Sequence, residues 1–137
     1  MSVVFFSFIF NFHDLSLEIK GDNGMKKAYR VKRNSEFQDI FKSGKSFANR
    51  ELVIYYKEKP AQTHFRIGIS VGKKIGNAVT RNRIKRYIRE SFIQLEDKVL
   101  PEIDIIVIAR KPAVSMNCKQ IKNSLLHLLR KQCLIHK

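Results

Sequence analysis

The sequence predicts a single two-layer α+β domain, and three observations lead to this fold class. The 137 residues, 44% of them hydrophobic, suit one domain with one core. Along residues 64–71 apolar and polar residues alternate, which is typical of a strand with one buried face. Along residues 78–96 apolar residues recur at helical spacing instead. No linker, internal repeat or low-complexity segment divides the chain.

The first helix is expected over residues 35–42. Asn34 and Ser35 offer N-caps, and Gly44 follows the last turn as a stop. Its apolar residues repeat at helical spacing: Phe37, Ile40 and Phe41. Four strands are expected: a brief edge strand at 45–48, strands at 51–57 and 64–71, and an apolar central strand at 103–109.

Two longer helices complete the domain, over residues 78–96 and 117–133. The first should bury Ile84, Ile88, Phe92 and Leu95. The second should bury Ile121, Leu125, Leu128 and Leu129. The element order is therefore α-β-β-β-α-β-α.

The charge of the chain points to a polyanionic partner. With 27 Lys and Arg against 12 Asp and Glu, the net charge is +15, and the repulsion between these charges is relieved when a polyanion binds. Nucleic acid fits better than an anionic membrane surface, because the charges are interleaved with strand segments instead of lying on one amphipathic helix. Cys118 and Cys133 form no CxxC pair, so free thiols and a reduced, cytoplasmic compartment are expected.

Residues 1–24 differ from the rest of the chain. They carry an apolar stretch with no basic residue before it, which is too short to span a bilayer. The codons of Lys20-Gly21-Asp22 can spell a purine-rich ribosome-binding site just before Met25. We therefore expect the native start at Met25, with residues 1–24 a non-native or disordered extension and residues 25–137 the domain.

The basic run from Lys73 to Arg89 is the candidate RNA-binding surface. A helical wheel at about 100° per residue places Asn82, Lys85, Arg86 and Arg89 on one flank beside the apolar stripe. Like charges at i,i+4 cost a few tenths of a kcal/mol without a partner, whereas guanidinium groups bind phosphate oxygens in pairs. A solvated helix face is the alternative, but such faces mix charges of both signs.

Protein-borne catalysis has no support in the sequence, which contains neither a catalytic histidine arrangement nor a phosphate-binding loop. Several acids could in principle hold Mg²⁺: Glu90, Glu96, Asp97, Glu102 and Asp104. Glu90 and Asp97 are more simply read as solvated charges.

Four blocks of sequence resemble the bacterial ribonuclease P protein component. The most specific runs from Lys73 to Arg86 and contains Arg81-Asn82-Arg83. The others are residues 34–41, residues 47–50 and residues 105–112, in the same order as in the family. The resemblance begins near Met25, and residues 1–24 match nothing in it.

The resemblance implies a ribosomal-protein-like fold with a left-handed β-α-β crossover. It implies a subunit of the ribonucleoprotein endoribonuclease that removes the 5′ leader from precursor tRNA, with hydrolysis carried by the RNA subunit and its Mg²⁺. The protein itself would hold no catalytic residue, metal or cofactor. Its partners would be the catalytic RNA and precursor tRNA, with no membrane and no protein oligomer required.

Two sets of contact residues follow from the resemblance. The RNA-subunit face would comprise Lys73, Lys74, Asn77, Arg81, Asn82, Arg83, Lys85, Arg86 and Arg89. The cleft for the precursor tRNA leader would comprise Phe37, Phe41, Tyr55, Asn49, Arg50 and Lys57. Bases stack on aromatic faces whatever their identity, and cations follow the phosphates. Tyr55 should face away from Ile54 on an exposed platform, whereas Phe37 and Phe41 taken alone would more often be core residues.

Three other functions would fit a basic α+β domain. A structural ribosomal protein or RNA chaperone would bind many RNAs without affecting cleavage. A protein-only metal nuclease would cut RNA unaided. A DNA-binding regulator is disfavoured because no helix-turn-helix spacing is present.

Overall fold

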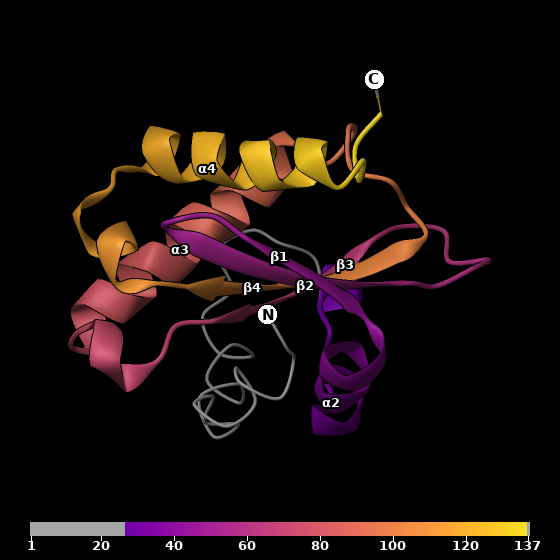
Figure 1. Cartoon of the computed structure of the whole chain (residues 1–137), viewed down its shortest axis with the longest axis horizontal. Helices are drawn as coiled ribbons and strands as arrows, with labels where there is room; N and C mark the ends of the chain where they lie inside the picture. The colour runs from indigo at the N-terminus through magenta and orange to yellow at the C-terminus, as the bar shows by residue number, and fades with distance from the viewer. Residues whose placement is uncertain (1–26, 137) are drawn as a thin grey trace.

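The computed structural model describes residues 27–136 and confirms the α+β class and the order of the main elements (Figure 1). The helices and strands are α2 (Asn34–Ser43), β1 (Lys45–Ala48), β2 (Leu52–Glu58), β3 (Arg66–Ser70), α3 (Ala78–Gln94), β4 (Ile103–Ala109) and α4 (Cys118–Lys131). Three 3-10 turns join them: η2 (Lys27–Tyr29), η3 (Lys73–Ile75) and η4 (Lys111–Ser115). The expectation for residues 1–24 lies outside the described residues.

The four strands form one sheet in the order β1-β2-β4-β3. The β1–β2 and β2–β4 pairs are antiparallel, whereas β3 and β4 are parallel and are joined through α3. The expected central position of β4 is confirmed, and its run of apolar residues reflects burial on both faces. The left hand of the crossover stays a prediction.

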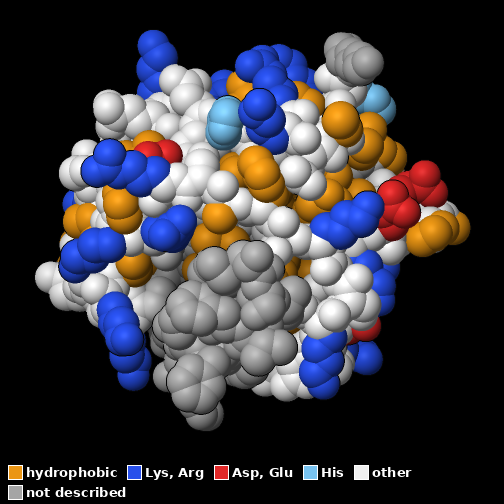
Figure 2. Space-filling model, in the orientation of Figure 1, with side chains coloured by type: hydrophobic (Ala, Val, Ile, Leu, Met, Phe, Trp, Pro, Cys, Tyr) orange, Lys and Arg blue, Asp and Glu red, His pale blue; other side chains and the backbone are white. Residues whose placement is uncertain are grey.

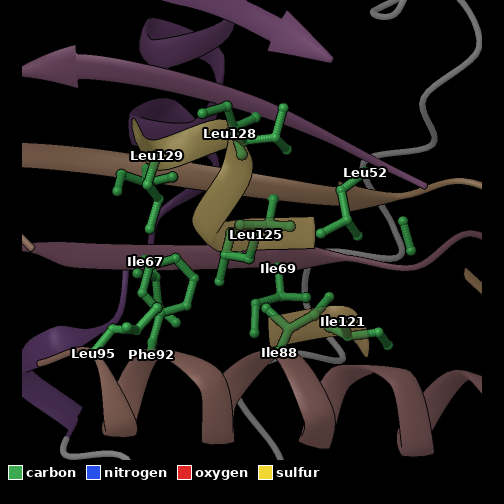
Figure 3. Packing of buried hydrophobic residues seen from close by; sticks show 14 of the residues in the cluster. Leu52, Ile67, Ile69, Ile88, Phe92, Leu95, Ile121, Leu125, Leu128 and Leu129 are labelled. Carbon is green, nitrogen blue, oxygen red and sulfur yellow. The ribbon is translucent and has the colours of Figure 1, made fainter. Parts of the chain in front are cut away.

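The larger core cluster lies between the sheet and the pair α3–α4 (Figure 3). Both expected helix stripes are confirmed, since all eight of their residues are buried. From the sheet, side chains such as Leu52, Ile67 and Ile69 point into the same cluster. These two layers account for most of the apolar burial in the described chain.

The shorter helix α2 lies on the opposite face of the sheet from α4 (Figure 1). There its buried residues Phe37, Ile40 and Phe41 pack against residues of β2 and β4. Gly68 makes this contact possible, because a Cβ at that position would lie 2.4 Å from a ring carbon of Phe37.

Helix α2 begins differently from the expectation. Asn34 is its first helical residue, so neither Asn34 nor Ser35 is the N-cap. The Glu36 carboxylate accepts a hydrogen bond from the backbone N–H of Arg33 at 3.2 Å and so satisfies the start of the helix from inside. The expected stop at Gly44 is confirmed, and a Cβ there would lie 2.5 Å from the carbonyl oxygen of Ile40. Within residues 27–136, no helix combines the length and apolar character needed to cross a bilayer.

Candidate RNA-binding surfaces

The loop before α3 presents its lysines at the end of the sheet where β3 and β4 both terminate. Lys73 and Lys74 are exposed there. Because neighbouring parallel strands end at the same edge, the segment after β4 lies beside this loop. The Lys111 ammonium donates to the carbonyl oxygens of Lys74 at 3.3 Å and Ile75 at 3.5 Å. Two segments far apart in the sequence thus place their cations together.

The junction between this loop and α3 is built by two of the expected RNA-contact residues. The Asn77 side chain accepts a hydrogen bond from the backbone N–H of Thr80 at 2.9 Å and caps the helix. The Arg81 Nε–H donates to the carbonyl oxygen of Gly76 at 3.2 Å. Asn77 is exposed and Arg81 is half-buried, so both hold the local backbone and still border the surface.

Along α3 the expected contact residues lie at different depths. Asn82 and Arg86 are exposed, and Arg83 is half-buried with its guanidinium donating to the carbonyl oxygen of Val114 at 2.8 Å. Lys85 and Arg89 are 3% and 5% exposed. The wheel explains this burial, because both positions directly adjoin the core stripe. A phosphate could reach them only if their surroundings open, and their contact role stays a prediction.

Three cations that the sequence did not assign to the RNA-subunit face extend it. Arg110 donates to the carbonyl oxygen of Asn49 at 2.9 Å, which brings Arg50 to the same end of the sheet as Lys111. We call the following set the basic surface: Arg50, Lys73, Lys74, Arg81, Arg83, Arg86, Arg110 and Lys111. Lys111 reaches the surface through the parallel pairing of β3 with β4, and Arg110 reaches it through the antiparallel pairing of β2 with β4; no local sequence pattern specifies either pairing.

The basic surface lacks acidic partners. No ion pair within 4.0 Å joins any of its eight cations to a carboxylate of residues 27–136. The nearest acids along the chain, Glu51 and Glu90, instead accept hydrogen bonds from Ser124 and Cys118 of α4. Figure 2 shows Lys and Arg side chains along the side of the molecule where α3 begins, and the largest acidic group at the other end. This arrangement leaves the cations available to external phosphates.

The expected leader cleft gives a mixed result. Phe37, Phe41 and Tyr55 do come together, and the rings of Phe41 and Tyr55 meet edge to face with centroids 4.8 Å apart. Tyr55 faces away from Ile54, as expected. The prediction that Tyr55 forms an exposed platform is wrong, however, because Tyr55 is 0% exposed and packs in the cluster of α2. Burial raises the pKa of its phenol to about 12, so the group is neutral near pH 7.

The three polar residues expected in the cleft lie at opposite ends of β2. The Asn49 side chain donates to the hydroxyl of Ser124 at 2.8 Å and accepts from the backbone N–H of Leu52 at 2.8 Å, so it ties the β1–β2 turn to α4. Arg50 is exposed beside it. Lys57, at the far end of the strand, donates to the Asp39 carboxylate at 2.7 Å. Only Lys57 lies near α2, and the leader-binding role of all three stays a prediction.

The described residues hold no group of three His, Cys, Asp or Glu side chains arranged to bind a metal ion. Asp104, one of the acids considered for Mg²⁺, is fully buried and is paired with Arg66 at 2.6 Å. Of the other acids considered for Mg²⁺, Glu90 accepts a hydrogen bond from the Cys118 thiol and Glu102 accepts one from the backbone N–H of Ala61.

Comparisons with known proteins identify the family. The family model for ribonuclease P matches residues 25–133. The ribonuclease P protein component of Oceanobacillus iheyensis is 64% identical over 111 residues, which cover 81% of this chain and 92% of the relative. That of Geobacillus kaustophilus is 55% identical over 107 residues, which cover 78% and 88%.

Solved structures agree with the sequence comparison. The RNase P protein of Staphylococcus aureus superposes with a TM-score of 0.75 at 51% identity, covering 80% of this chain and 100% of that one. The RNase P protein of Thermotoga maritima gives 0.69 at 32% identity, covering 74% and 96%. The chain therefore belongs to the ribonuclease P protein family, as a subunit of the endoribonuclease that matures the 5′ ends of tRNA.

Proposed function

We propose that the basic surface holds the catalytic RNA subunit of ribonuclease P. The observation that carries this proposal is the group of eight cations that gather from four segments of the chain without a carboxylate partner among the described residues. Such a group is costly in the isolated protein, and phosphates relieve that cost when they bind. Phosphodiester hydrolysis would remain with the RNA and its Mg²⁺, while the protein reduces repulsion between phosphates.

The 5′ leader of precursor tRNA would bind on the sheet face that carries α2. In support, Phe41 and Tyr55 share this face with the cation Lys57, and single-stranded RNA favours such pairings of aromatic rings and charge. Since both rings are buried here, stacking of bases on them requires this face to open. The free thiols Cys118 and Cys133 are consistent with work in the reducing cytoplasm.

Reconstitution tests the first proposal. The chain is mixed with a bacterial ribonuclease P RNA and a precursor tRNA at low Mg²⁺, and leader removal is measured against the RNA alone. The double variant Lys73→Gln/Lys74→Gln should bind the RNA about tenfold more weakly, with a salt slope lower by about two units. Lys42→Gln/Lys45→Gln removes the same charge from exposed sites away from the basic surface and serves as the control.

The outcomes separate the competing functions. No stimulation of cleavage over the RNA alone would contradict the proposal. Equal binding to unrelated RNAs would favour an RNA chaperone, and cleavage by the protein alone would favour a metal nuclease.

The leader contact needs a gentler variant than Phe37→Ala, because Phe37 is a core residue here. Phe41→Leu keeps an apolar side chain and removes the aromatic ring. It should weaken binding of precursor tRNA more than binding of mature tRNA, as measured by equilibrium titration of the assembled complex. An equal loss for both RNAs would assign Phe41 to the core alone.

A further inference from the structure

Helix α4 has an outward face that neither the fold nor the proposed contacts use. Its inward stripe is buried in the larger core cluster. On the opposite side a second stripe follows the i,i+4 and i,i+3 spacing of one helix face: Lys119, Asn123, His127 and Arg130. All four residues of this stripe are exposed, and Lys131 is exposed on its flank.

All the formal charges on this helix are positive. The segment Cys118–Lys131 contains four Lys and Arg and no Asp or Glu. None of these four cations forms an ion pair within 4.0 Å with a carboxylate of the described chain. Solvated helices ordinarily mix both signs, because i,i+4 pairs of opposite charge stabilise the helix whereas like pairs weaken it.

The same face is hollowed between apolar residues. A depression of about 600 Å³ at the end of α4 is lined by Lys98, Leu126, Arg130, Cys133, Ile135 and His136. A second depression of about 360 Å³ shares Leu126 and Arg130 with the first, and His127 and Lys131 also line it. In Figure 2, apolar side chains lie among Lys, Arg and His over α4.

An RNA strand matches this combination of chemistry. The apolar side chains of Leu126 and Ile135, which line the larger depression, suit the face of a base, and bases also stack on the imidazole of histidine. The cations Arg130 and Lys131, which line the smaller depression, suit the phosphates on either side of that base. An acidic peptide would use the charges but has no comparable need for the apolar lining.

We propose that the outward face of α4 is a second RNA-binding surface, which holds a strand of the catalytic RNA by its phosphates and bases. The proposal rests on the proposed function, since it adds a second contact with the same partner. It is separate from the basic surface, because its cations come from α4 and the chain end, not from the loops at the start of α3.

The test compares two triple variants with equal loss of charge. Lys119→Gln/Arg130→Gln/Lys131→Gln neutralises the outward face, and glutamine retains a good helix propensity. Lys32→Gln/Lys42→Gln/Lys45→Gln removes three exposed charges elsewhere. Binding of the catalytic RNA is titrated over a range of salt concentrations. The α4 variant should bind at least tenfold more weakly with a slope lower by about two units, and the control should change far less.

A single variant tests the contact with bases. His127→Ala should weaken binding severalfold while leaving the salt slope close to its wild-type value, because stacking of a base on the face of a ring releases no counterions. Circular dichroism and urea unfolding of each variant verify that α4 remains folded.

Two results would overturn the proposal. One is equal affinity and slope for the α4 variant and its control while Lys73→Gln/Lys74→Gln still loses RNA, which would leave the basic surface intact as the proposed RNA site. The other is an α4 variant that keeps its RNA affinity but loses binding to polyglutamate or to vesicles containing phosphatidylserine. If Lys73→Gln/Lys74→Gln also binds RNA like the wild type, the proposed function itself fails.

Discussion

The two ends of the sheet use their positive charges in opposite ways. At the end where β2 finishes and β4 starts, Arg66 pairs with Glu36 at 2.8 Å and with Asp104 at 2.6 Å, and Lys57 pairs with Asp39 at 2.7 Å. At the other end, none of the cations of the basic surface is paired with a carboxylate of residues 27–136. The first end, which we call the paired end, therefore uses cations to hold α2 on the sheet. The second, the available end, leaves them for an external partner.

The largest loss of stability is expected from a substitution that removes an ion pair at the paired end. Asp104→Asn removes the carboxylate that receives Arg66 through Nε at 3.0 Å and through a terminal nitrogen at 2.6 Å, in a fully buried position. We expect the free energy of unfolding to fall by about 3 kcal/mol, because one charge of a buried pair loses its partner. Urea denaturation measures the loss.

Glu58→Gln is the control for Asp104→Asn, because Glu58 is exposed at the same end of the sheet. It should change the unfolding free energy by less than about 0.5 kcal/mol. A loss below about 1 kcal/mol for Asp104→Asn would show that Glu36 alone suffices to hold Arg66.

A matched pair of glycine variants compares the packing beneath α2 with the loop of the basic surface. In Gly68→Ala the new methyl group would meet the Phe37 ring at 2.4 Å, so α2 must shift, and we expect a loss of about 2 kcal/mol. In Gly76→Ala, in the loop of the basic surface, the nearest atoms are two side-chain carbons of Thr80 at 3.1 and 3.2 Å, so a shift of a few tenths of an ångström relieves the contact. Thermal unfolding should therefore rank Gly68→Ala below Gly76→Ala, and the reverse order would contradict this comparison.

Sequence periodicity predicted the core because it is a local property of each helix and strand. The stripe from Ile84 to Leu95 and the central strand at 103–109 needed no knowledge of the rest of the chain. The paired end could not be predicted in this way, because Arg66 and Asp104 lie 38 residues apart. Their contact depends on the parallel register of β3 with β4, which no local pattern specifies.

The sequence predicted which face each side chain of the candidate site occupies better than it predicted how deeply that side chain is buried. The wheel placed Lys85 and Arg89 on the flank beside the core stripe, and the structure shows how far this flank is buried. An angle around a helix axis does not reveal what covers the helix. Likewise, alternation told which face Tyr55 occupies but not that Phe41 would pack against it. Arg110 and Lys111 were not predicted as members of the basic surface, because only tertiary structure brings them to it.

Acid titration should weaken the paired end selectively. Burial alone would raise the pKa of the Glu36 carboxyl. Hydrogen bonds and the charge of Arg66 lower it by more, so the pKa of Glu36 is lowered overall. Hydrogen bonds from Lys57 and Ser43 lower the pKa of Asp39. A carboxyl whose pKa is lower in the folded state stabilises the fold above its unfolded pKa, and this stability is lost as pH falls through the folded pKa.

The loss should begin near pH 5 and continue as the two carboxyls become protonated. Unfolding midpoints measured between pH 7 and pH 3 should fall less steeply for Glu36→Gln than for the wild type. Lys73→Gln should follow the wild-type curve, because it changes no carboxyl. An identical pH dependence for Glu36→Gln and the wild type would remove Glu36 from this account.

The smallest expected effect is the most specific to the basic surface. Lys73→Gln/Lys74→Gln removes two exposed charges that form no ion pair with residues 27–136, so the unfolding free energy should change by less than about 0.5 kcal/mol. Any change should be a gain, because two like charges no longer repel their neighbours, and added salt should shrink it by screening. Urea denaturation at low and high salt measures both quantities. A clear loss of stability would mean that these lysines hold the loop together. Cations would then stabilise the fold at both ends of the sheet, and the two ends would differ only in how strongly they do so.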